Sequence, residues 1–284
     1  MHIYYEKRNF RTMSNKKKLL KRITLTALLI FMGTVVCFVI YDRATINSEY
    51  AIGEKDLQIP IFVYHDIVKD ESEVQFDYMQ TTADTFEKQI IGLKKYGYNF
   101  ITYEDLQKYR NNQKKIKKKS CIITFDDGYE GVYENAYPIA KKYNIPITLY
   151  VITDNMDKDG LLTWDEAKEM QNSGLVTIAS HSINHPQFTD LGLEEAVNNV
   201  NTSYEIIEQN LGTQEPKIFT YPYGLYTDEE INALQNEGYI QNLTDNKINK
   251  SKSLDLARLH RCYPLSDSPV KIIIKIAYRS IRYN

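Results

Sequence analysis

The sequence predicts a parallel α/β domain, and two observations support this prediction. Apolar runs rich in β-branched and aromatic residues alternate, along residues 59–237, with segments whose apolar residues recur at helical spacing. Polar residues follow directly after several of the apolar runs. The alternation favours a parallel sheet covered by helices, and in barrels of this class the active site lies where the strands end.

Six strands are expected from the apolar runs. The first, IPIFVY, ends at His65 and Asp66, and a later one, CIITF, runs into Asp126 and Asp127. Continuous apolar runs of this length indicate strands that are buried on both faces. The expected strands are residues 59–64, 99–102, 121–125, 147–152, 175–179 and 218–221.

Helices are expected between these strands. Phe86, Ile90 and Leu93 recur at the spacing of one helix face. Thr163 and Glu166 form a capping-box pattern at the start of another helix. The expected helices are residues 85–96, 103–109, 135–143, 163–174, 193–211 and 228–237, and several of them end at a glycine.

Composition excludes some functions. A net charge of -2 gives the chain no general attraction to nucleic acid. Cys37 lies inside an apolar run, and Cys121 and Cys262 lie far apart without the spacing of metal ligands. We expect Cys121 and Cys262 to be unpaired. A disulfide between them, which could form only outside the cell, is the less favoured alternative.

The chain begins with a basic segment followed by a long apolar one. Residues 23–41 contain no charged side chain, and 19 residues at a rise of about 1.5 Å approach the roughly 30 Å hydrocarbon core of a bilayer. Eight Lys and Arg precede this run, and two occur in the fifteen residues after it. Because basic flanks stay in the cytoplasm, we predict a single-pass anchor in the cell membrane with the rest of the chain extracellular.

The predicted topology divides the chain into four parts. Residues 1–22 are a cytoplasmic basic N-terminus, 23–41 a transmembrane anchor, 42–58 a juxtamembrane linker and 59–284 the globular domain. A cleaved signal peptide is the competing interpretation, although the apolar run is long and no small-residue cleavage site follows it. Met13 resembles a translation start more than Met1 does, since a lysine-rich stretch follows it.

Two further segments are unusual in charge. Residues 112–119 hold five lysines, for which a solvated loop is the expected structure. Residues 270–282, VKIIIKIAYRSIR, are apolar and basic. A surface helix near a membrane is one interpretation of this segment; a terminal element packed on the domain is the one we favour.

Adjacent carboxylates follow one predicted strand, in the segment TFDDG at residues 124–128. Asp126 and Asp127 repel one another unless positive charge lies nearby. Gly128 allows a sharp turn that can direct both side chains into a pocket. An Asp-Gly turn is commonly just solvated, so this motif alone does not establish a site.

Two histidines follow another predicted strand, in the segment HSINH. His181 and His185 can converge on one metal ion if the segment takes a helical turn. An isolated pair with this spacing is more often two unrelated polar residues. Together with one aspartate, the pair would leave coordination positions open for water and substrate, as catalytic zinc sites do.

These motifs resemble those of the NodB-like polysaccharide deacetylases, carbohydrate esterase family 4. The family is marked by T-F-D-D-G, H-[ST]-x-x-H and R-x-P-Y segments, and the first two stand at residues 124–128 and 181–185. The third stands as TYPYG at residues 220–224, with Thr220 in the place of the arginine. That arginine orients the catalytic aspartate in many members, so here the aspartate must be held in another way. The resemblance covers most of residues 59–265 and implies a distorted (β/α) barrel.

Within the family, the chain most resembles the poly-β-1,6-N-acetylglucosamine deacetylases of the intercellular-adhesin and biofilm type. The shared features are VYHD at residues 63–66, YPYG without the arginine, and RLxR at residues 258–261. The acid histidine of that subgroup comes from the N-terminal strand, which implies His65. His260, in ARLHR, is the rival for the same role.

The resemblance implies a role for each site residue. Asp127, His181 and His185 would hold a divalent metal, most plausibly Zn²⁺, which activates water and polarises a carbonyl. Asp126 would be the general base and His65 the acid that protonates the leaving amine. The main-chain N–H of Tyr223 would bind the oxyanion. Tyr64, Tyr129, Trp164, Tyr221 and Tyr223 are candidates for stacking on sugar rings, with Tyr223 favoured.

The expected function is therefore removal of N-acetyl groups from an extracellular N-acetylglucosamine polymer. Within the family, a peptidoglycan or chitooligosaccharide deacetylase or an acetyl-xylan esterase are alternatives. A third interpretation is a carbohydrate-binding relative that has lost catalysis. The replacement of the family arginine by Thr220 favours it, and the presence of Asp126, Asp127, His181 and His185 argues against it. A polymer-making synthase is a plausible partner by analogy alone.

Overall fold

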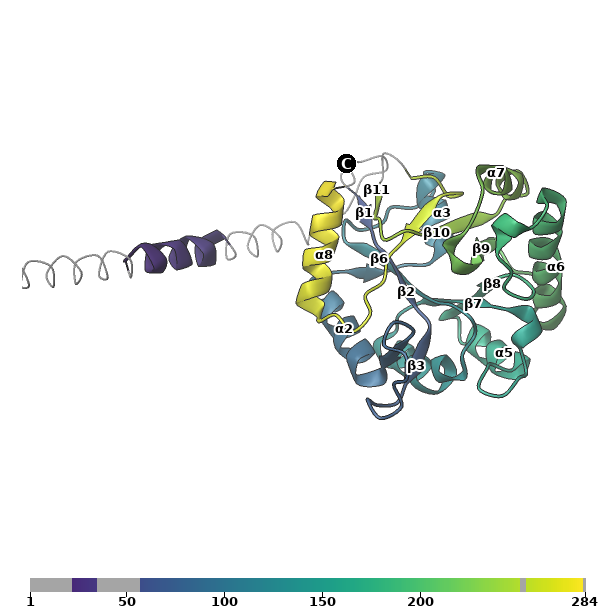
Figure 1. Cartoon of the computed structure of the whole chain (residues 1–284), viewed down its shortest axis with the longest axis horizontal. Helices are drawn as coiled ribbons and strands as arrows, with labels where there is room; N and C mark the ends of the chain where they lie inside the picture. Colours follow the sequence, from purple (N-terminus) through teal and green to yellow (C-terminus); the bar gives the residue numbers. More distant parts are fainter. Residues whose placement is uncertain (1–21, 35–56, 251–253, 283–284) are drawn as a thin grey trace, which may run out of the picture. The chain divides into compact units, whose positions relative to one another are not determined.

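The computed structural model describes residues 22–34, 57–250 and 254–282 of the chain (Figure 1). The chain divides into two compact units, Met1–Asn47 and Ser48–Asn284. The second unit contains the predicted globular domain, and its description begins at Leu57.

In the first unit, residues 22–34 are helical. Across the described residues, no helix combines the length and apolar character needed to cross a membrane. The transmembrane helix expected over residues 23–41 is thus not found there. Residues 35–41 of that segment lie outside the described residues, as do residues 1–21 and most of the linker.

The second unit is built around one eight-stranded sheet whose pairings are all parallel. Its order is β12-β10-β9-β8-β7-β6-β2, with β5 also beside β6. Every residue of β6 and β7 is buried, as expected for strands covered on both faces. The strands are β2 Ile61–Tyr64, β5 Asn99–Phe100, β6 Ser120–Phe125, β7 Ile147–Val151, β8 Val176–Ser180, β9 Ile218–Thr220, β10 Ile240–Thr244 and β12 Leu259–Arg261.

The two outer strands of this order, β12 and β2, meet and nearly close the sheet into a barrel. The Val63 N–H donates to the Cys262 carbonyl at 3.0 Å, and the Cys262 N–H donates to the Ile61 carbonyl at 2.8 Å. The last strand of the chain is therefore a neighbour of the first long one. The expected distorted (β/α) barrel is confirmed by this closure and by the parallel order.

Helices surround the strands (Figure 1). They form where the sequence places apolar residues at helical spacing behind a capping residue. Thr163 and Glu166 make the expected capping box, and Thr102 with Asp105 makes a second one. The helices are α2 Ala83–Lys95, α3 Tyr103–Arg110, α4 Tyr137–Tyr143, α5 Trp164–Asn172, α6 Leu193–Leu211, α7 Asp228–Asn236 and α8 Pro269–Arg282.

Shorter elements connect these. β1 Gln58–Ile59 pairs with β11 Asn249–Lys250, and β3 Asp66–Val68 pairs with β4 Gln80–Thr82. A π-helical segment, η1 Val132–Ala136, precedes α4, so that helical region begins earlier than expected. The 3-10 turns are η2 Thr153–Asn155, η3 Phe188–Asp190 and η4 Pro222–Gly224.

Two expectations about single segments are confirmed. Cys121 and Cys262 are buried and unpaired. The C-terminal segment is a helix packed on the domain, with Ile272 and Ile276 buried. β10 and β12 were not expected from the sequence, because neither short strand carries a long apolar run.

Candidate active site

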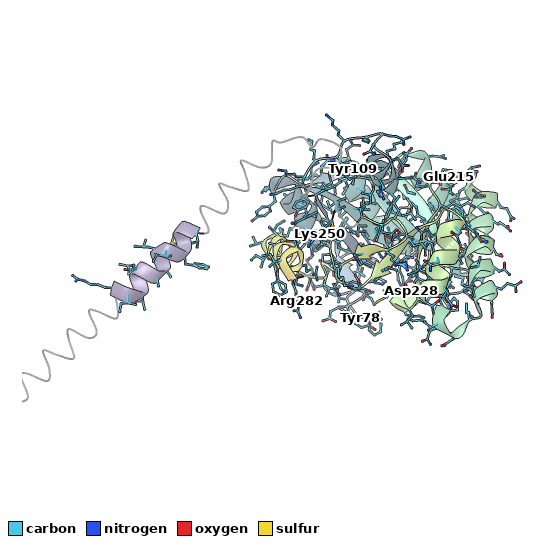
Figure 2. The ribbon with its side chains drawn as sticks, turned by 90° about the horizontal axis from the view of Figure 1, so that it is seen from above. Tyr78, Tyr109, Glu215, Asp228, Lys250 and Arg282 are labelled. Atoms are coloured by element: carbon cyan, nitrogen blue, oxygen red, sulfur yellow. The ribbon has the colours of Figure 1, made fainter. Side chains whose placement is uncertain are left out.

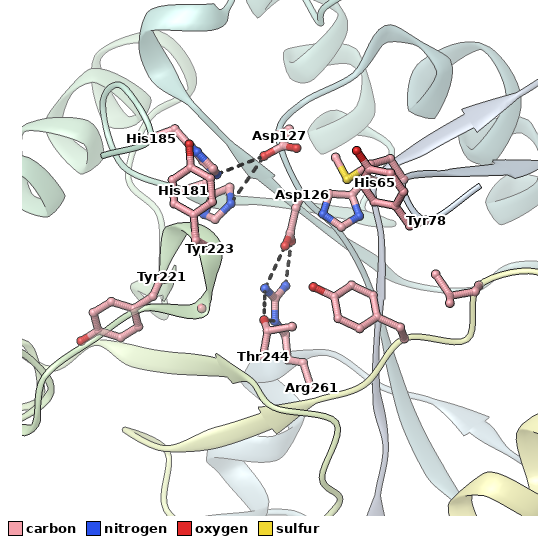
Figure 3. Close-up of a pocket in the computed structure, with 14 residues that line it drawn as sticks. His65, Tyr78, Asp126, Asp127, His181, His185, Tyr221, Tyr223, Thr244 and Arg261 are labelled. Carbon is pink, nitrogen blue, oxygen red and sulfur yellow. Dashed lines mark hydrogen bonds and ion pairs between the residues drawn. The ribbon is translucent and has the colours of Figure 1, made fainter. Parts of the chain in front are cut away.

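A pocket of about 480 Å³ lies at the carboxyl ends of the barrel strands (Figure 3), and we call it the rim pocket. β2, β6, β8, β9, β10 and β12 each deliver a residue to it at or directly after their last position, because parallel strands end on the same rim. The residues that line it are His65, Tyr78, Met79, Asp126, Asp127, His181, His185, Tyr221, Tyr223, Gly224, Thr244, Arg261, Tyr263 and Leu265.

Asp127, His181 and His185 converge in this pocket as the sequence predicts. The Oδ1 atom of Asp127 lies 3.5 Å from Nε2 of His181 and 3.6 Å from Nε2 of His185. One ligand atom from each residue lies within 4.8 Å of the others. Oδ1 of Asp127 is buried without a hydrogen-bond partner in the described structure, and such an atom is what a bound cation would satisfy. The donor set therefore fits a divalent metal.

The ring of His181 is oriented for metal binding. Its Nδ1 lies 2.9 Å from the Thr220 carbonyl and donates a hydrogen bond to it, which leaves Nε2 with a free lone pair toward Asp127. A backbone partner of this kind commonly fixes the tautomer of a metal-binding histidine. Burial lowers the pKa of His181 to about 3, so the ring is neutral at physiological pH, as a ligand must be.

The two histidines converge without the helical turn that was considered as the way to bring them together. The segment after β8 is irregular, with Ser182 and His185 both in the left-handed region at φ values of 75° and 56°. The two rings nevertheless lie with centroids 4.8 Å apart. Asp127 and Tyr223 also have positive φ values, 71° and 58°. Such backbone is costly outside glycine, and its gathering around one pocket is typical of functional sites.

Asp126 is held by a buried arginine. Arg261, the last residue of β12, donates to both carboxylate oxygens of Asp126, from Nη1 at 2.7 Å and from Nη2 at 2.8 Å. Arg261 is 1% exposed. Burial alone would raise the pKa of Asp126, but the guanidinium outweighs burial and holds that pKa at about 2. Asp126 is therefore ionised at any physiological pH.

Asp127 has the opposite environment. Burial raises its pKa, the neighbouring charge of Asp126 raises it further, and the pKa reaches about 7 in the absence of a cation. The two adjacent carboxylates thus differ strongly in their preference for a proton. Since a cation would neutralise this effect, the arrangement suits Asp127 as the metal ligand and Asp126 as a separate base.

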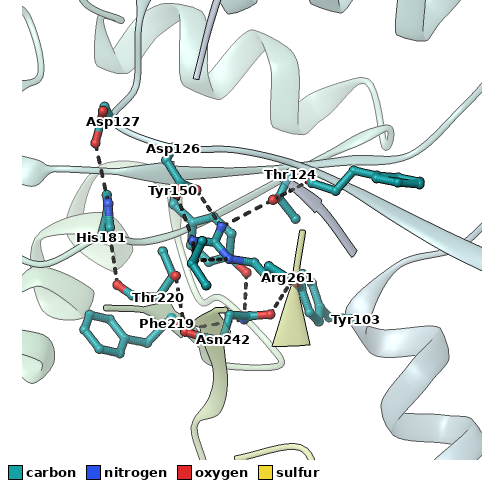
Figure 4. A network of polar contacts seen from close by, with 12 residues as sticks. Tyr103, Thr124, Asp126, Asp127, Tyr150, His181, Phe219, Thr220, Asn242 and Arg261 are labelled. Carbon is teal, nitrogen blue, oxygen red and sulfur yellow. Dashed lines mark hydrogen bonds and ion pairs between the residues drawn. The ribbon is translucent and has the colours of Figure 1, made fainter. Parts of the chain in front are cut away.

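A polar network beneath the pocket supports Arg261 (Figure 4). Its guanidinium donates to Thr244 Oγ1 at 2.8 Å and to Thr124 Oγ1 at 3.3 Å, and it lies 5.2 Å from the centre of the Tyr150 ring. Asn242 links the hydroxyls of Tyr150 and Tyr103, at 2.9 Å and 2.6 Å. Because these groups are buried and paired, the fork of Arg261 is fixed toward Asp126.

The arginine that the third motif lacks is therefore supplied from another strand. Thr220 is fully buried, and its carbonyl binds His181. The RLxR segment was recognised from the sequence, but the role of Arg261 was not. No strand was expected there, so the sequence did not show which way its side chains face. In the structure β12 alternates faces, and Arg261 is buried while His260 is partly exposed.

His65 and His260 have different surroundings. His65, which follows β2, lies in the rim pocket with its ring stacked on Tyr263 at a centroid distance of 6.1 Å. Burial lowers the pKa of His65, and the charge of Asp126 acts against that shift. His260 lies outside the pocket, with Nδ1 2.9 Å from Asp245 Oδ2.

Only some of the aromatic residues expected to stack on sugar rings lie in the rim pocket. The Tyr223 ring is 66% exposed and lies 4.4 Å from the His185 ring, centroid to centroid. Tyr221 lines the pocket but is buried, with its hydroxyl bonded to Gln241. Tyr64 is buried in the core, and Tyr129 and Trp164 do not line the pocket. Tyr78 and Tyr263 line it and were missed, since neither stands in a motif.

Comparison with known proteins places this site in a family. The sequence profile of the polysaccharide deacetylases matches residues 113–241. YxkH of Bacillus subtilis, named as a polysaccharide deacetylase, is 30% identical over 215 residues, which cover 76% of this chain and 74% of YxkH. A poly-β-1,6-N-acetyl-D-glucosamine N-deacetylase of Staphylococcus aureus is 28% identical over 205 residues, or 68% of this chain and 70% of the relative.

A solved structure agrees with this assignment. The Streptococcus pyogenes deacetylase PplD, determined in complex with acetate, superposes with a TM-score of 0.70 and 27% identity. The superposition covers 78% of this chain and 99% of PplD. The profile, the relatives and the barrel agree, and the chain belongs to the polysaccharide deacetylase family.

Proposed function

We propose that the chain is a metal-dependent N-deacetylase of an extracellular N-acetylglucosamine polymer, with poly-β-1,6-N-acetylglucosamine as the favoured substrate. The observation that carries this proposal is the rim pocket, in which three convergent metal ligands lie beside an ionised carboxylate and an imidazole. The staphylococcal relative, named for the β-1,6 polymer, supports the choice of substrate.

Asp127, His181 and His185 would hold the divalent ion, with Zn²⁺ favoured by one carboxylate and two imidazoles. When bound, such an ion lowers the pKa of water and polarises a carbonyl. Asp126 would accept the proton of the attacking water, since it is ionised and its oxygens keep lone pairs beyond those used by Arg261.

Two further groups would act on the acetamide. The main-chain N–H of Tyr223 would donate to the carbonyl oxygen as negative charge develops there. His65, protonated, would give its proton to the nitrogen as the C–N bond breaks, because an amine anion is a very poor leaving group. Acetate and the free amine are the products. Asp126 then loses its proton and His65 takes one up again, which the charge of Asp126 favours.

Acetate release on linkage isomers tests the substrate. Purified Ser48–Asn284 should release acetate faster from β-1,6-linked than from β-1,4-linked N-acetylglucosamine oligomers of equal length. An Asp126→Asn variant serves as the inactive control. A preference for the β-1,4 oligomers, or for acetylated xylan, would overturn the proposed linkage; no release from any of them by metal-loaded protein would overturn the activity.

Metal content tests the ligand set without reference to activity. After loading with Zn²⁺ and removal of the excess, the unit Ser48–Asn284 should retain one ion by elemental analysis. A His181→Ala/His185→Ala double variant should retain almost none, because two of three protein ligands are gone. His260→Ala is the matched control and should bind like the wild type. Undiminished metal in the double variant would refute the site.

The acid assignment separates His65 from His260. His65→Ala should lower amide hydrolysis by about 10²–10⁴-fold, the usual contribution of a positioned acid, and leave metal content nearly unchanged. An activated aryl acetate should be affected far less, since a phenolate leaves without a proton. His260→Ala should cost little in either assay. The assignment fails if His260→Ala abolishes amide cleavage while His65→Ala does not.

The role of Arg261 is tested by a substitution that keeps its positive charge but removes the guanidinium group, which binds both oxygens of Asp126. Arg261→Lys should lower kcat by roughly 10- to 100-fold, because Asp126 loses one charge-assisted hydrogen bond and its fixed orientation. Arg258→Lys is the control: Arg258 pairs with the exposed Asp228 and has no hydrogen bond to Asp126, so both activity and stability should be nearly unchanged. Equal kinetics for the two variants would show that Asp126 does not depend on the fork.

We further propose that residues 23–41 anchor the chain in the cell membrane with the deacetylase unit outside. The uncharged run and its basic flank support this. Protease added to intact cells stripped of their wall should degrade the unit Ser48–Asn284. Full protection of that unit would contradict the orientation, and a mature N-terminus beyond Tyr41 would indicate a cleaved signal peptide instead.

A further inference from the structure

Helix α8 carries an apolar row of side chains on its solvent side and a basic row beside it, which borders the face packed on the domain. The apolar row is Val270, Ile274, Tyr278 and Ile281, with exposed fractions of 53%, 62%, 56% and 74%. The basic row is Lys271, Lys275, Arg279 and Arg282, each one position after a member of the apolar row. Steps of four, four and three residues keep each row on one side of a helix.

The opposite side of α8 is fixed to the domain. Ile272, Ile276 and Ser280 are buried, and α8 lies against α2 so closely that a side chain at Gly92 would meet Pro269 at 2.2 Å. The core therefore uses only the inward face of α8. Four exposed apolar side chains in one row are not required for that packing, and an exposed apolar row of this kind usually marks an interaction surface.

The charge of α8 differs from that of the rest of the unit. Residues 57–284 hold 25 Lys and Arg against 32 Asp and Glu, a net charge of -7, whereas α8 has four basic residues and no acidic one. Asp267 pairs with both Lys271 and Lys275, while Arg279 donates to Asn246 and Arg282 to the Tyr278 hydroxyl. Because only Asp267 among these partners is charged, the basic row keeps a net positive charge. On a unit that is acidic as a whole, a helix with four basic and no acidic residues favours contact with an anionic surface.

The end of α8 lies beside the point where the chain enters the domain. Lys250, in β11, donates to the Ser280 carbonyl at 2.9 Å, and β11 pairs with β1 at Gln58–Ile59. Lys250 and Arg282 are labelled on either side of α8 in Figure 2. The C-terminal end of α8 is therefore joined to β11, whose partner strand β1 begins at Gln58.

We propose that α8 docks the domain on an anionic lipid bilayer. The apolar row lies at the boundary between headgroups and acyl chains, and the basic row contacts lipid phosphates. A second copy of α8 fits less well, because the helix offers no acidic residue to meet the basic row. Docking would hold the rim pocket at a fixed height above the lipid. This proposal is independent of the proposed function, because lipid binding does not require deacetylase activity.

Vesicle sedimentation tests this proposal on the unit Ser48–Asn284, which lacks residues 23–41. The buried hydrophobic residues of the described chain run from Leu57 to Ile276, so this unit retains its core. It should sediment with vesicles of equal phosphatidylglycerol and phosphatidylcholine, less so at high salt, and little with phosphatidylcholine alone. Ile274→Ser/Ile281→Ser should lower the partition coefficient at least about tenfold, since binding scales with buried apolar area.

The controls separate docking from folding and from catalysis. Leu193→Ser, which changes an exposed apolar residue on α6, should bind vesicles like the wild type. The docking variant should keep the wild-type melting temperature and acetate release from soluble oligomers. Wild-type protein that remains in the supernatant, or an Ile274→Ser/Ile281→Ser variant that binds equally well, overturns the proposal. A dimer that is lost in that variant, without vesicle binding, would assign the surface to a second copy instead.

Discussion

The site depends on one buried ion pair, that between Asp126 and Arg261. Two charges removed from water are costly unless their geometry is good and their other hydrogen-bonding groups are satisfied. Here both carboxylate oxygens meet the guanidinium fork, and Thr124 and Thr244 accept its remaining hydrogens. The pair keeps Asp126 ionised, and that charge in turn raises the pKa of Asp127 until a cation binds. The two adjacent aspartates thereby have different roles.

Closure of the barrel assembles this pair. Arg261 ends the last strand, His65 follows the first long strand, and the two strands are joined by the hydrogen bonds between Val63, Cys262 and Ile61. The base, its arginine and the proposed acid therefore come from opposite ends of the domain sequence. A chain that ended before β12 would keep Asp127, His181 and His185 and lose the arginine that binds Asp126.

Much of this could be predicted from the sequence, for identifiable physical reasons. β6 and β8 are buried apolar strands followed at once by Asp126, Asp127 and His181, so a parallel sheet had to bring those side chains to one rim. Arg261 could not be placed in the same way, because β12 is three residues long and has no apolar periodicity. The positive φ values at Ser182 and His185 could not be predicted from the sequence either, since they follow from tertiary packing rather than from local backbone preference.

The most direct test of this division of roles is anomalous diffraction at the zinc edge from crystals of Ser48–Asn284 grown with Zn²⁺. One peak should lie between Asp127 Oδ1 and the Nε2 atoms of His181 and His185, with Asp126 outside the coordination sphere and still bonded to both arms of Arg261. A metal ion bound by Asp126, with Arg261 turned away from it, would contradict the account.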